Sequence, residues 1–260
     1  EVRRDAAGNI TRAFYVNGTA RPLDETTRSW LAKFVLDAVR QGGFDAEKRV
    51  QRVLSQRGVA GVLAEIAQIS GDYAKRRYYQ ELIKQANLDA TALRDVLRQV
   101  ARDISSDYEQ AQLLIAVAPM LTGREAAIQP FFDAVATIKS DYEHSRVLKT
   151  LVKEGTPSSA VLVLVASSTK SITSDYERRG VLTAVARTKN QSEEVLRLLL
   201  DCAAELSSDY EKATFLIEVS NVYTGDTRLR SAFLKAVETI KSDYERGRVL
   251  SALLKNKQIS

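Results

Sequence analysis

The chain of 260 residues is poor in the residue types that usually build reactive centres. It contains one cysteine, Cys202, and one histidine, His144. A single cysteine cannot form an internal disulfide, and one cysteine with one histidine cannot make a zinc site of the usual Cys/His kind. We therefore predict no metal site, and we interpret Cys202, which lies within an apolar helical run, as a small buried residue.

Residues that break helices and long apolar runs are also scarce. There are four prolines and twelve glycines, and 45% of the residues are apolar, which is typical of a folded and mostly helical protein. The apolar run at 160–166 falls far short of the roughly 20 residues that span a bilayer. We expect membrane contact only through segments upstream of this sequence, since a chain that begins with Glu1 reads as part of a longer protein.

Motifs that would indicate an enzyme are absent from the sequence. It has no glycine-rich phosphate loop, no metal-ligand spacing and no nucleophile elbow. The carboxylates of the repeats are spread along the chain. They are too far apart for two of them to act as general acid and general base on the same bond. His144 occupies a variable position of a repeat, and we expect an exposed helical residue there. We predict no catalytic activity and no cofactor.

Charge of one sign is not concentrated anywhere in the chain. The 38 basic and 33 acidic residues are interspersed and give a net charge of +5. A surface that tracks phosphates would show a clustered basic face with aromatic side chains free to stack. We therefore do not expect nucleic acid as a partner.

What the chain does contain is an internal repeat. Six tyrosines are separated by 35 residues once and by 34 residues four times, within similar motifs. A fixed period of this length is typical of one helix-pair unit stacked on copies of itself. It predicts an all-α fold, a right-handed α-α superhelical solenoid like HEAT and tetratricopeptide arrays in architecture. The tyrosines are Tyr73, Tyr108, Tyr142, Tyr176, Tyr210 and Tyr244.

The pattern divides the chain into a β-hairpin left from an upstream β segment (1–23), an N-terminal capping helix with a degenerate helix pair (24–70), and the repeat array (71–260). Asn17-Gly18 between β-forming residues is a strong hairpin signal. Asp24 offers a helix N-cap, and Gly58 separates the two helices of the degenerate pair. We expect the array to hold five helix pairs and to end in a single helix from Asp243 to Lys255.

The motif around the tyrosines, mostly Ser-Asp-Tyr-Glu, predicts a capped helix start. The serine can accept a backbone hydrogen bond three residues on, and the glutamate can reach back to the serine N–H, which makes a capping box. The aspartate adds negative charge at the positive end of the helix dipole. We assign this structural role to Ser106, Ser140, Ser174, Ser208 and Ser242 with Glu109, Glu143, Glu177, Glu211 and Glu245.

The tyrosines lie beside an apolar seam formed by residues five, six and nine positions later, such as Val147, Leu148 and Leu151. The residue three positions after the tyrosine is small in four units, as if a neighbouring ring or backbone came close. We predict a packing ladder between repeats, with paired hydroxyls, for Tyr108, Tyr142, Tyr176, Tyr210 and Tyr244. An exposed aromatic row that binds a partner is the alternative.

A mostly basic ladder follows two residues after each tyrosine. In one interpretation it is an electrostatic stripe for an acidic peptide, a polyanionic polymer or lipid head groups. In the other, the basic stems cover the apolar seam and their charged ends pair with nearby carboxylates. The possible partner-binding residues are Lys75, His144, Arg178, Lys212 and Arg246, with Gln110 at the remaining position.

The repeats and the segment before them resemble a known family. The Ser-Asp-Tyr-Glu units, the strand-turn segment 14–22 and a helix with Trp30-Leu31 are similar to the C-terminal regions of bacterial BlaR-type membrane metallopeptidases and related antirepressor-like envelope proteins. The resemblance covers essentially the whole chain. It implies a sensor or interaction region on the extracytoplasmic side of a membrane. The His-Glu-x-x-His zinc helix of those peptidases is absent from this sequence, so no catalytic residue carries over.

Together these observations favour a non-catalytic scaffold that binds a protein or peptide partner, and the resemblance implies that it belongs to an envelope signalling protein. One alternative is a structural spacer or assembly module without a ligand. Another is a polyanion binder that uses the basic ladder. A cytoplasmic location and the oligomeric state are left open by the sequence.

Overall fold

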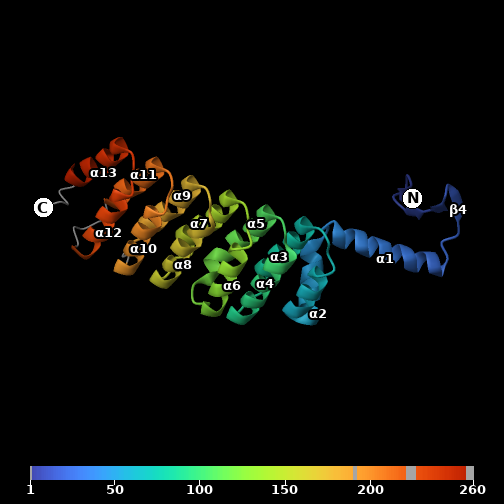
Figure 1. Ribbon diagram of the computed structural model, residues 1–260. Coiled ribbons are helices and arrows are strands. Elements are labelled where there is room, and N and C mark those ends of the chain that lie inside the picture. The colour runs from blue at the N-terminus through green and yellow to red at the C-terminus, as the bar shows by residue number, and fades with distance from the viewer. Residues whose placement is uncertain (1, 190–191, 221–226, 256–260) are drawn as a thin grey trace.

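The computed structural model describes residues 2–189, 192–220 and 227–255. These residues are mostly helical, with two small antiparallel hairpins at the N-terminal end (Figure 1). The prediction of a mostly helical chain that begins with a small β element is therefore confirmed.

The hairpins are β1 (Val2–Arg4) with β2 (Ile10–Arg12), and β3 (Phe14–Val16) with β4 (Thr19–Arg21). The second is the predicted one. Asn17 and Gly18 form its turn, and both have positive φ, as a two-residue turn of this kind requires. The first was not predicted. Its loop, residues 5–9, is closed by the Asp5 carboxylate, which accepts the N–H groups of Ala7 and Asn9.

Helix α1 (Glu25–Gln41) links the hairpins to the rest of the chain and projects away from it (Figure 1). The Asp24 side chain accepts the N–H of Thr27, which confirms the predicted N-cap. None of the residues of α1 is buried. The Trp30 ring lies 5.9 Å from that of Phe14 and 5.4 Å from that of Phe34, so the hairpin touches the helix. We call residues 2–41 the arm.

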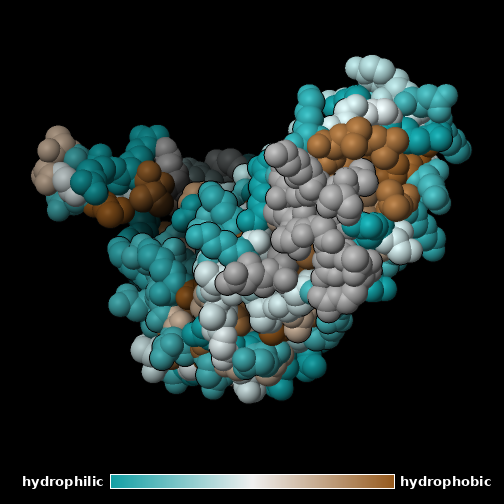
Figure 2. All heavy atoms as spheres, turned by 90° about the vertical axis from the view of Figure 1, so that its left-hand side faces the viewer, coloured by the Kyte–Doolittle hydropathy of each residue, from teal (hydrophilic) through white to brown (hydrophobic). Residues whose placement is uncertain are grey.

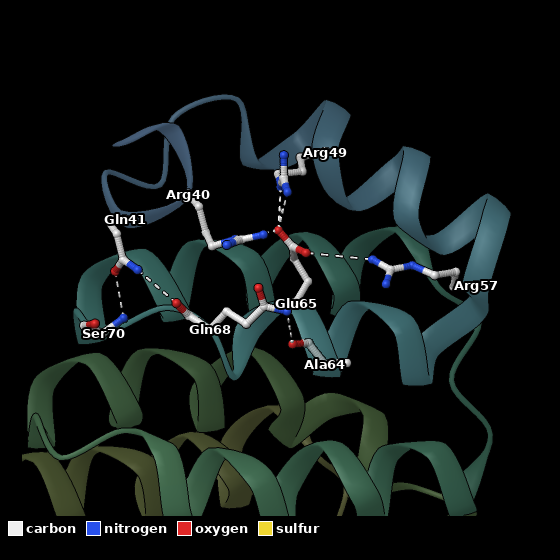
Figure 3. Close-up of polar contacts among 8 residues, drawn as sticks. All are labelled: Arg40, Gln41, Arg49, Arg57, Ala64, Glu65, Gln68 and Ser70. Carbon is white, nitrogen blue, oxygen red and sulfur yellow. Dashed lines mark hydrogen bonds and ion pairs between the residues drawn. The ribbon is translucent and has the colours of Figure 1, made fainter. Parts of the chain in front are cut away.

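Helix α2 (Ala46–Ile66) is interrupted at Gly58, where φ is 64°, so it is the predicted pair of short helices. A buried carboxylate joins this pair to the arm (Figure 3). Glu65 accepts hydrogen bonds from Arg40 at the end of the arm and from Arg49, and Arg57 lies 3.8 Å away. Burial alone would raise the pKa of Glu65, but the arginines lower it. The last turn of α1 is thereby held on α2.

The remaining helices form two layers. Odd-numbered helices pack on odd-numbered neighbours, and even-numbered helices on even-numbered neighbours (Figure 1). From here on we call α2 to α13 the array, so that it includes the degenerate helix pair as well as the repeats. The odd layer contains α3 (Asp72–Gln85), α5 (Asp107–Val117), α7 (Asp141–Glu154), α9 (Asp175–Ala186), α11 (Asp209–Ser220) and α13 (Asp243–Lys255). The even layer contains α4 (Ala90–Asp103), α6 (Glu125–Val135), α8 (Ser159–Ser168), α10 (Glu193–Ala204) and α12 (Thr227–Glu238).

The helix order follows the predicted period. Helix α13 spans the predicted Asp243–Lys255, and each odd helix after α3 begins at the aspartate of a motif. Two short 3-10 segments, at Ala118–Leu121 and Thr169–Ser171, follow α5 and α8. Residues 221–226, between α11 and α12, lie outside the described residues.

The core runs between the two layers along the whole array. The predicted seam is buried, with Val147 and Leu148 fully enclosed and Leu151 nearly so. Cys202 is also fully buried, as predicted, and burial raises the pKa of its thiol. A buried thiol of raised pKa is a poor nucleophile.

Candidate binding surface

The motif serines cap the helices as predicted. In each of five motifs the serine hydroxyl accepts the N–H of the glutamate three residues on, at 3.3 to 3.4 Å. The serines are Ser106, Ser140, Ser174, Ser208 and Ser242. The start of each odd helix from α5 onward is therefore fixed locally, by residues of its own motif.

The motif aspartates connect one unit to the next, a role that the sequence analysis did not predict. Each carboxylate accepts two backbone N–H groups just before the next odd helix, at 2.6 to 3.1 Å. Hydrogen bonds from charged groups to backbone N–H are among the stronger ones in proteins. The acceptors are Asp72, Asp107, Asp141, Asp175 and Asp209. We call them the staple aspartates.

Two staple aspartates show the electrostatic effect of these contacts. The N–H of Ser242 contributes most to lowering the pKa of Asp209, with Lys241 also contributing. Burial would raise the pKa of Asp141, but hydrogen bonds from Thr173 and Ser174 lower it overall. Both carboxylates are thereby held in the charged form that accepts the N–H groups.

The motif glutamates do not complete the predicted capping boxes. The serine N–H, which the glutamate was expected to bind, instead donates to a staple aspartate. The glutamates bind basic or hydroxyl side chains instead, because the serine N–H already donates to the aspartate of the previous motif. Their partners lie on the preceding odd helix, as with Arg76 and Glu109, or on the same helix, as with Arg146 and Glu143.

An arginine stands between a tyrosine of one unit and the glutamate of the next at four junctions. Arg76 lies over the Tyr73 ring, 5.3 Å from its centroid, and pairs with Glu109. Arg179 does the same for Tyr176 and Glu211. In these two junctions the arginine comes three residues after the tyrosine that it covers. One side chain thus contacts both an aromatic ring and a carboxylate of the neighbouring unit.

At two other junctions the arginine comes from the following unit. Arg146 lies over Tyr108 at 5.9 Å and pairs with Glu143 on its own helix. Arg248 lies over Tyr210 at 5.5 Å and pairs with Glu245 in the same way. Here the residue three after the tyrosine is a buried alanine, Ala111 or Ala213, so the arginine arrives from the other side of the junction.

The junction between α7 and α9 uses different residues. Glu177 accepts a hydrogen bond from Ser145 and pairs with Lys149 at 3.1 Å. Gly180 stands where Arg146 and Arg248 stand in their units, and a side chain added there would meet Lys149. A lysine thus occupies the place that an arginine has elsewhere.

The basic ladder is not an outward stripe. Gln110, His144, Arg178 and Lys212 are buried, so the expectation of an exposed His144 was also wrong. These side chains reach the C-terminal end of the even helix in the same unit, where free carbonyl groups favour donors and positive charge. Lys75 donates to the Asp103 carbonyl at 2.5 Å.

The other ladder residues make equivalent contacts. Gln110 binds the Ala134 carbonyl and the Thr137 hydroxyl, the His144 ring contacts the Ser168 hydroxyl, Arg178 pairs with Glu205, and Lys212 binds the Thr239 carbonyl and hydroxyl. In the last motif Arg246 pairs with Asp243 at 3.2 Å. Burial lowers the pKa values of His144 and Lys212, against the opposing effect of nearby aspartates. The ladder therefore braces the two helices of a unit.

The tyrosines point outward, which contradicts the predicted packing ladder. All six are between 51% and 76% exposed. The seam predicted the buried side of the helix correctly, but each tyrosine lies at the edge of that side and keeps more than half of its surface exposed. Each is the second residue of an odd helix, so the rings repeat along one side of the odd layer. We call Tyr73, Tyr108, Tyr142, Tyr176, Tyr210 and Tyr244 the tyrosine row.

Other kinds of site find no support in the described part of the chain. Within residues 2–189, 192–220 and 227–255 there is no group of three or more histidine, cysteine, aspartate or glutamate side chains placed to hold a metal ion. None of the helices in those ranges combines the length and apolar character needed to cross a membrane. Comparison with protein-family models, with curated proteins and with solved structures found no match.

Proposed function

We propose that this chain is a non-catalytic scaffold that binds a protein or peptide partner through the tyrosine row. The observation that carries the proposal is the exposure of six tyrosines at equivalent positions of successive units. A residue exposed in one unit is unremarkable in itself, but here the same large aromatic ring is exposed in every unit. Its repetition provides a series of like contacts for one extended partner.

The chemistry of the row suits protein recognition. Tyrosine and arginine are enriched among the residues that contribute most binding energy at interfaces. A tyrosine also loses little conformational entropy on binding, because it has only two side-chain torsions. The arginines over Tyr73, Tyr108, Tyr176 and Tyr210 are themselves paired with glutamates. The rings are thus held in place before a partner arrives, which reduces the cost of binding.

The finer architecture forms part of this proposal. We infer that the array is a right-handed α-α superhelical solenoid of the HEAT and tetratricopeptide type. The packing of odd helices on odd and even helices on even supports this, because each unit then contacts only its neighbours. A scaffold of this kind can carry a long binding surface without a deep pocket.

Two alternatives are less well supported. A polyanion binder based on the basic ladder would need those side chains free, yet Gln110, His144, Arg178 and Lys212 are buried against helix ends. A structural spacer would need only the caps, staples and core, and it leaves the exposed tyrosines unexplained. The envelope location and the signalling role implied by the resemblance stay predictions, as does the absence of catalysis.

The test compares three forms of the chain as bait in bacterial envelope and cytosolic extracts. The first is the unaltered chain, and the second carries Tyr108→Ala, Tyr142→Ala and Tyr176→Ala. The third is a matched control with three exposed residues of the even layer changed, Arg98→Ala, Gln129→Ala and Arg197→Ala. Retained proteins are quantified by mass spectrometry at low and moderate salt, after circular dichroism has shown equal helix content.

The expected result is a protein retained by the unaltered chain and by the control at both salt concentrations, but lost from the tyrosine variant. Equal retention by all three forms would remove the tyrosine row from the proposal. Retention at low salt only would favour a polyanion, because such binding weakens steeply as salt rises. If nothing is retained in any condition, the spacer becomes the better description.

A further inference from the structure

The junction between α7 and α9 lies in the middle of the tyrosine row, with two junctions on either side of it. It lacks the arginine that the other four junctions hold. The two positions that supply an arginine elsewhere carry Ser145 on α7 and Gly180 on α9. In the part of the chain that the structure describes, no basic side chain lies over the Tyr142 ring. We call Tyr142, Glu177 and Gly180 the open junction.

The open junction keeps the carboxylate that pairs with an arginine elsewhere, and one of its oxygens has no partner. Ser145 and Lys149 both donate to Oε2 of Glu177. Lys149 thereby replaces the arginine in the ion pair without covering the ring. Among the described residues nothing donates to Oε1, and this oxygen is not enclosed. It can therefore accept a hydrogen bond from a group outside the chain.

Gly180 explains why the ring is uncovered. Arg146 and Arg248, at the same position of their units, lie over the tyrosine of the preceding unit at 5.9 and 5.5 Å. Gly180 has no side chain that could do so. A glycine inside a helix lowers the stability of that helix. This residue therefore contributes open space rather than stability to α9.

The charge of the open junction favours a cation. Asp141 and Glu177 bring two negative charges to this junction, and Lys149 brings one positive charge. One negative charge is thus in excess, and the negative face of a tyrosine ring attracts a cation as well. A basic side chain of a partner is therefore favoured over an acidic one.

Resting on the proposed function of the tyrosine row, we propose that the open junction binds an arginine side chain of the partner. The guanidinium stacks on the Tyr142 ring and donates to Oε1 of Glu177. The chain's own arginines make the same pair of contacts, to a ring and to a glutamate, at the other four junctions. A guanidinium is planar and carries several donors in a fixed arrangement, so it makes both contacts at once, unlike the compact ammonium of lysine. Because the other four junctions are already filled, this contact fixes the register of an extended partner along the row.

An extended partner can reach the open junction. Helices α7 and α9 lie in the middle of the odd layer, and the arm continues beyond α2 at one end of the array (Figure 1). Viewed along the array, the arm stands out to one side (Figure 2). Tyr142 is 58% exposed, so a partner that lies along the row meets this ring with other tyrosines on both sides.

The first experiment reads the Tyr142 ring directly. The chain is prepared with 3-fluorotyrosine, and the fluorine resonance of this residue is the one that disappears in Tyr142→Phe. Acetylated and amidated Gly-Ser-X-Ser-Gly peptides are titrated, in which X is arginine, glutamate or citrulline, which has nearly the shape of arginine without its charge. The arginine peptide should shift this resonance and bind about two- to fivefold more tightly than the citrulline peptide. Equal binding of these two, a response to the glutamate peptide alone, or no response to any peptide would overturn the proposal.

A pair of variants tests the geometry. Gly180→Arg places an arginine of the chain itself over Tyr142 and should abolish the preference for the arginine peptide. Gly180→Ala is the matched control, since it leaves the ring uncovered and should keep that preference. An added Cβ comes no closer than 3.6 Å to Lys149, so neither variant should unfold, and circular dichroism checks this. Equal preference in the two variants would contradict the proposed position of the guanidinium.

A variant of Lys149 tests the sign of the charge. Lys149→Gln introduces the residue that Gln80 provides at the equivalent position of α3, and it releases Glu177 from its ion pair. The arginine peptide should then bind up to about fivefold more tightly. Weaker binding would mean that the lysine itself holds the ligand, and the proposal would be wrong.

The bait experiment separates this inference from the proposed function. Gly180→Arg and Gly180→Ala are added as baits in the same extracts. Loss of the partner from Gly180→Arg, with retention by Gly180→Ala, supports an arginine at the open junction. If the triple tyrosine variant loses the partner while both glycine variants retain it, the inference fails and the proposed function stands. If the unaltered chain retains no protein, the proposed function fails, and the peptide titration alone decides whether the open junction selects arginine.

Discussion

The arm and the array use similar amino acids with opposite results. Helix α1 carries Trp30, Phe34 and Val35 on its surface, and all three are exposed. Helix α9 in the middle of the array has Val181, Leu182 and Val185 at helical spacing, and all three are fully buried. The difference is not in composition. It lies in whether a second helix of the same kind stands on each side.

This comparison shows that a helix in this molecule gains its stability from neighbours rather than from its own sequence. Isolated helices of this length are marginal in water, and packing of the apolar side supplies most of their stability. In the described residues the arm is tied to the array at its C-terminal end, through Arg40 and Gln41. We therefore expect the arm to respond to mutation locally and the array to respond cooperatively.

The largest contrast is expected between truncating a buried apolar side chain of the array and truncating an exposed one of the arm. Leu182→Ala removes a fully buried side chain from α9 and should lower the free energy of unfolding by about 2 to 5 kcal/mol. Phe34→Ala removes an exposed ring from the arm and should change it by less than about 0.5 kcal/mol. Urea unfolding followed by far-UV circular dichroism measures both. Similar losses from the two variants would mean that the arm unfolds together with the array.

The next contrast concerns two aspartates that both accept backbone N–H groups. Asp175→Ala leaves the N–H groups of Ser207 and Ser208 without their acceptor and should cost about 1 to 3 kcal/mol. Asp24→Ala removes the cap of α1 and should leave the main unfolding transition unchanged, because the loss stays within the arm. Hydrogen exchange localises each effect. Faster exchange around Ser207 without any loss of stability would show that the staple orients the units but does not stabilise them.

The sequence predicts the parts of this fold that follow from contacts within one unit. The motif serines, the turn at Asn17-Gly18 and the cap at Asp24 all bind residues at most three positions away, so local rules suffice. The staple contacts join residues 32 to 34 positions apart, such as Asp175 and Ser208. The sequence analysis assigned that aspartate to the dipole of its own helix, because nothing within the motif indicates which backbone N–H groups of the next unit bind it.

The candidate site could have been found from a pattern across units. Where the residue three after a tyrosine is arginine, as at Arg76, the residue four after the next tyrosine is not, as at Gln112. Where the residue three after a tyrosine is alanine, as at Ala111, the residue four after the next tyrosine is arginine, as at Arg146. At four of the five junctions a single arginine is supplied from one side or the other, which indicates that both positions face the same place. The exposure of the tyrosine itself has no such signal, because helical phase leaves it at the border of the buried side.

A smaller effect should appear as a dependence of stability on pH. The pKa of His144 is lowered in the folded chain, chiefly by burial, so the unfolded chain binds the proton more readily. Stability should therefore be complete above the ordinary histidine pKa of about 6.5 and fall as the pH drops through that value. Each pKa unit of difference is worth about 1.4 kcal/mol. Thermal unfolding followed from about pH 7.5 down to about pH 5, roughly one unit either side of that pKa, measures this loss of stability.

A matched control for this prediction exists within the chain. Gln110 occupies the equivalent position on α5 and binds the end of α6 without titrating. His144→Gln should keep the brace between α7 and α8 and reduce the loss of stability in this pH range. An unchanged pH dependence in that variant would assign the effect to the carboxylates instead.

The smallest effect is expected for the tyrosine row, and it distinguishes the row from Tyr79, a buried tyrosine six residues after Tyr73. Tyr79 is fully buried and its hydroxyl donates to Asp103 at 3.2 Å, so Tyr79→Phe should cost about 1 kcal/mol and leave an aspartate without its donor. Tyr176 is exposed beneath Arg179, and Tyr176→Phe should change the free energy of unfolding by less than about 0.5 kcal/mol, because the ring and its contact with the arginine remain. Urea unfolding of the two variants side by side measures the difference. A loss from Tyr176→Phe as large as that from Tyr79→Phe would return the row to a structural role, since an exposed hydroxyl kept for a partner contributes nothing to folding.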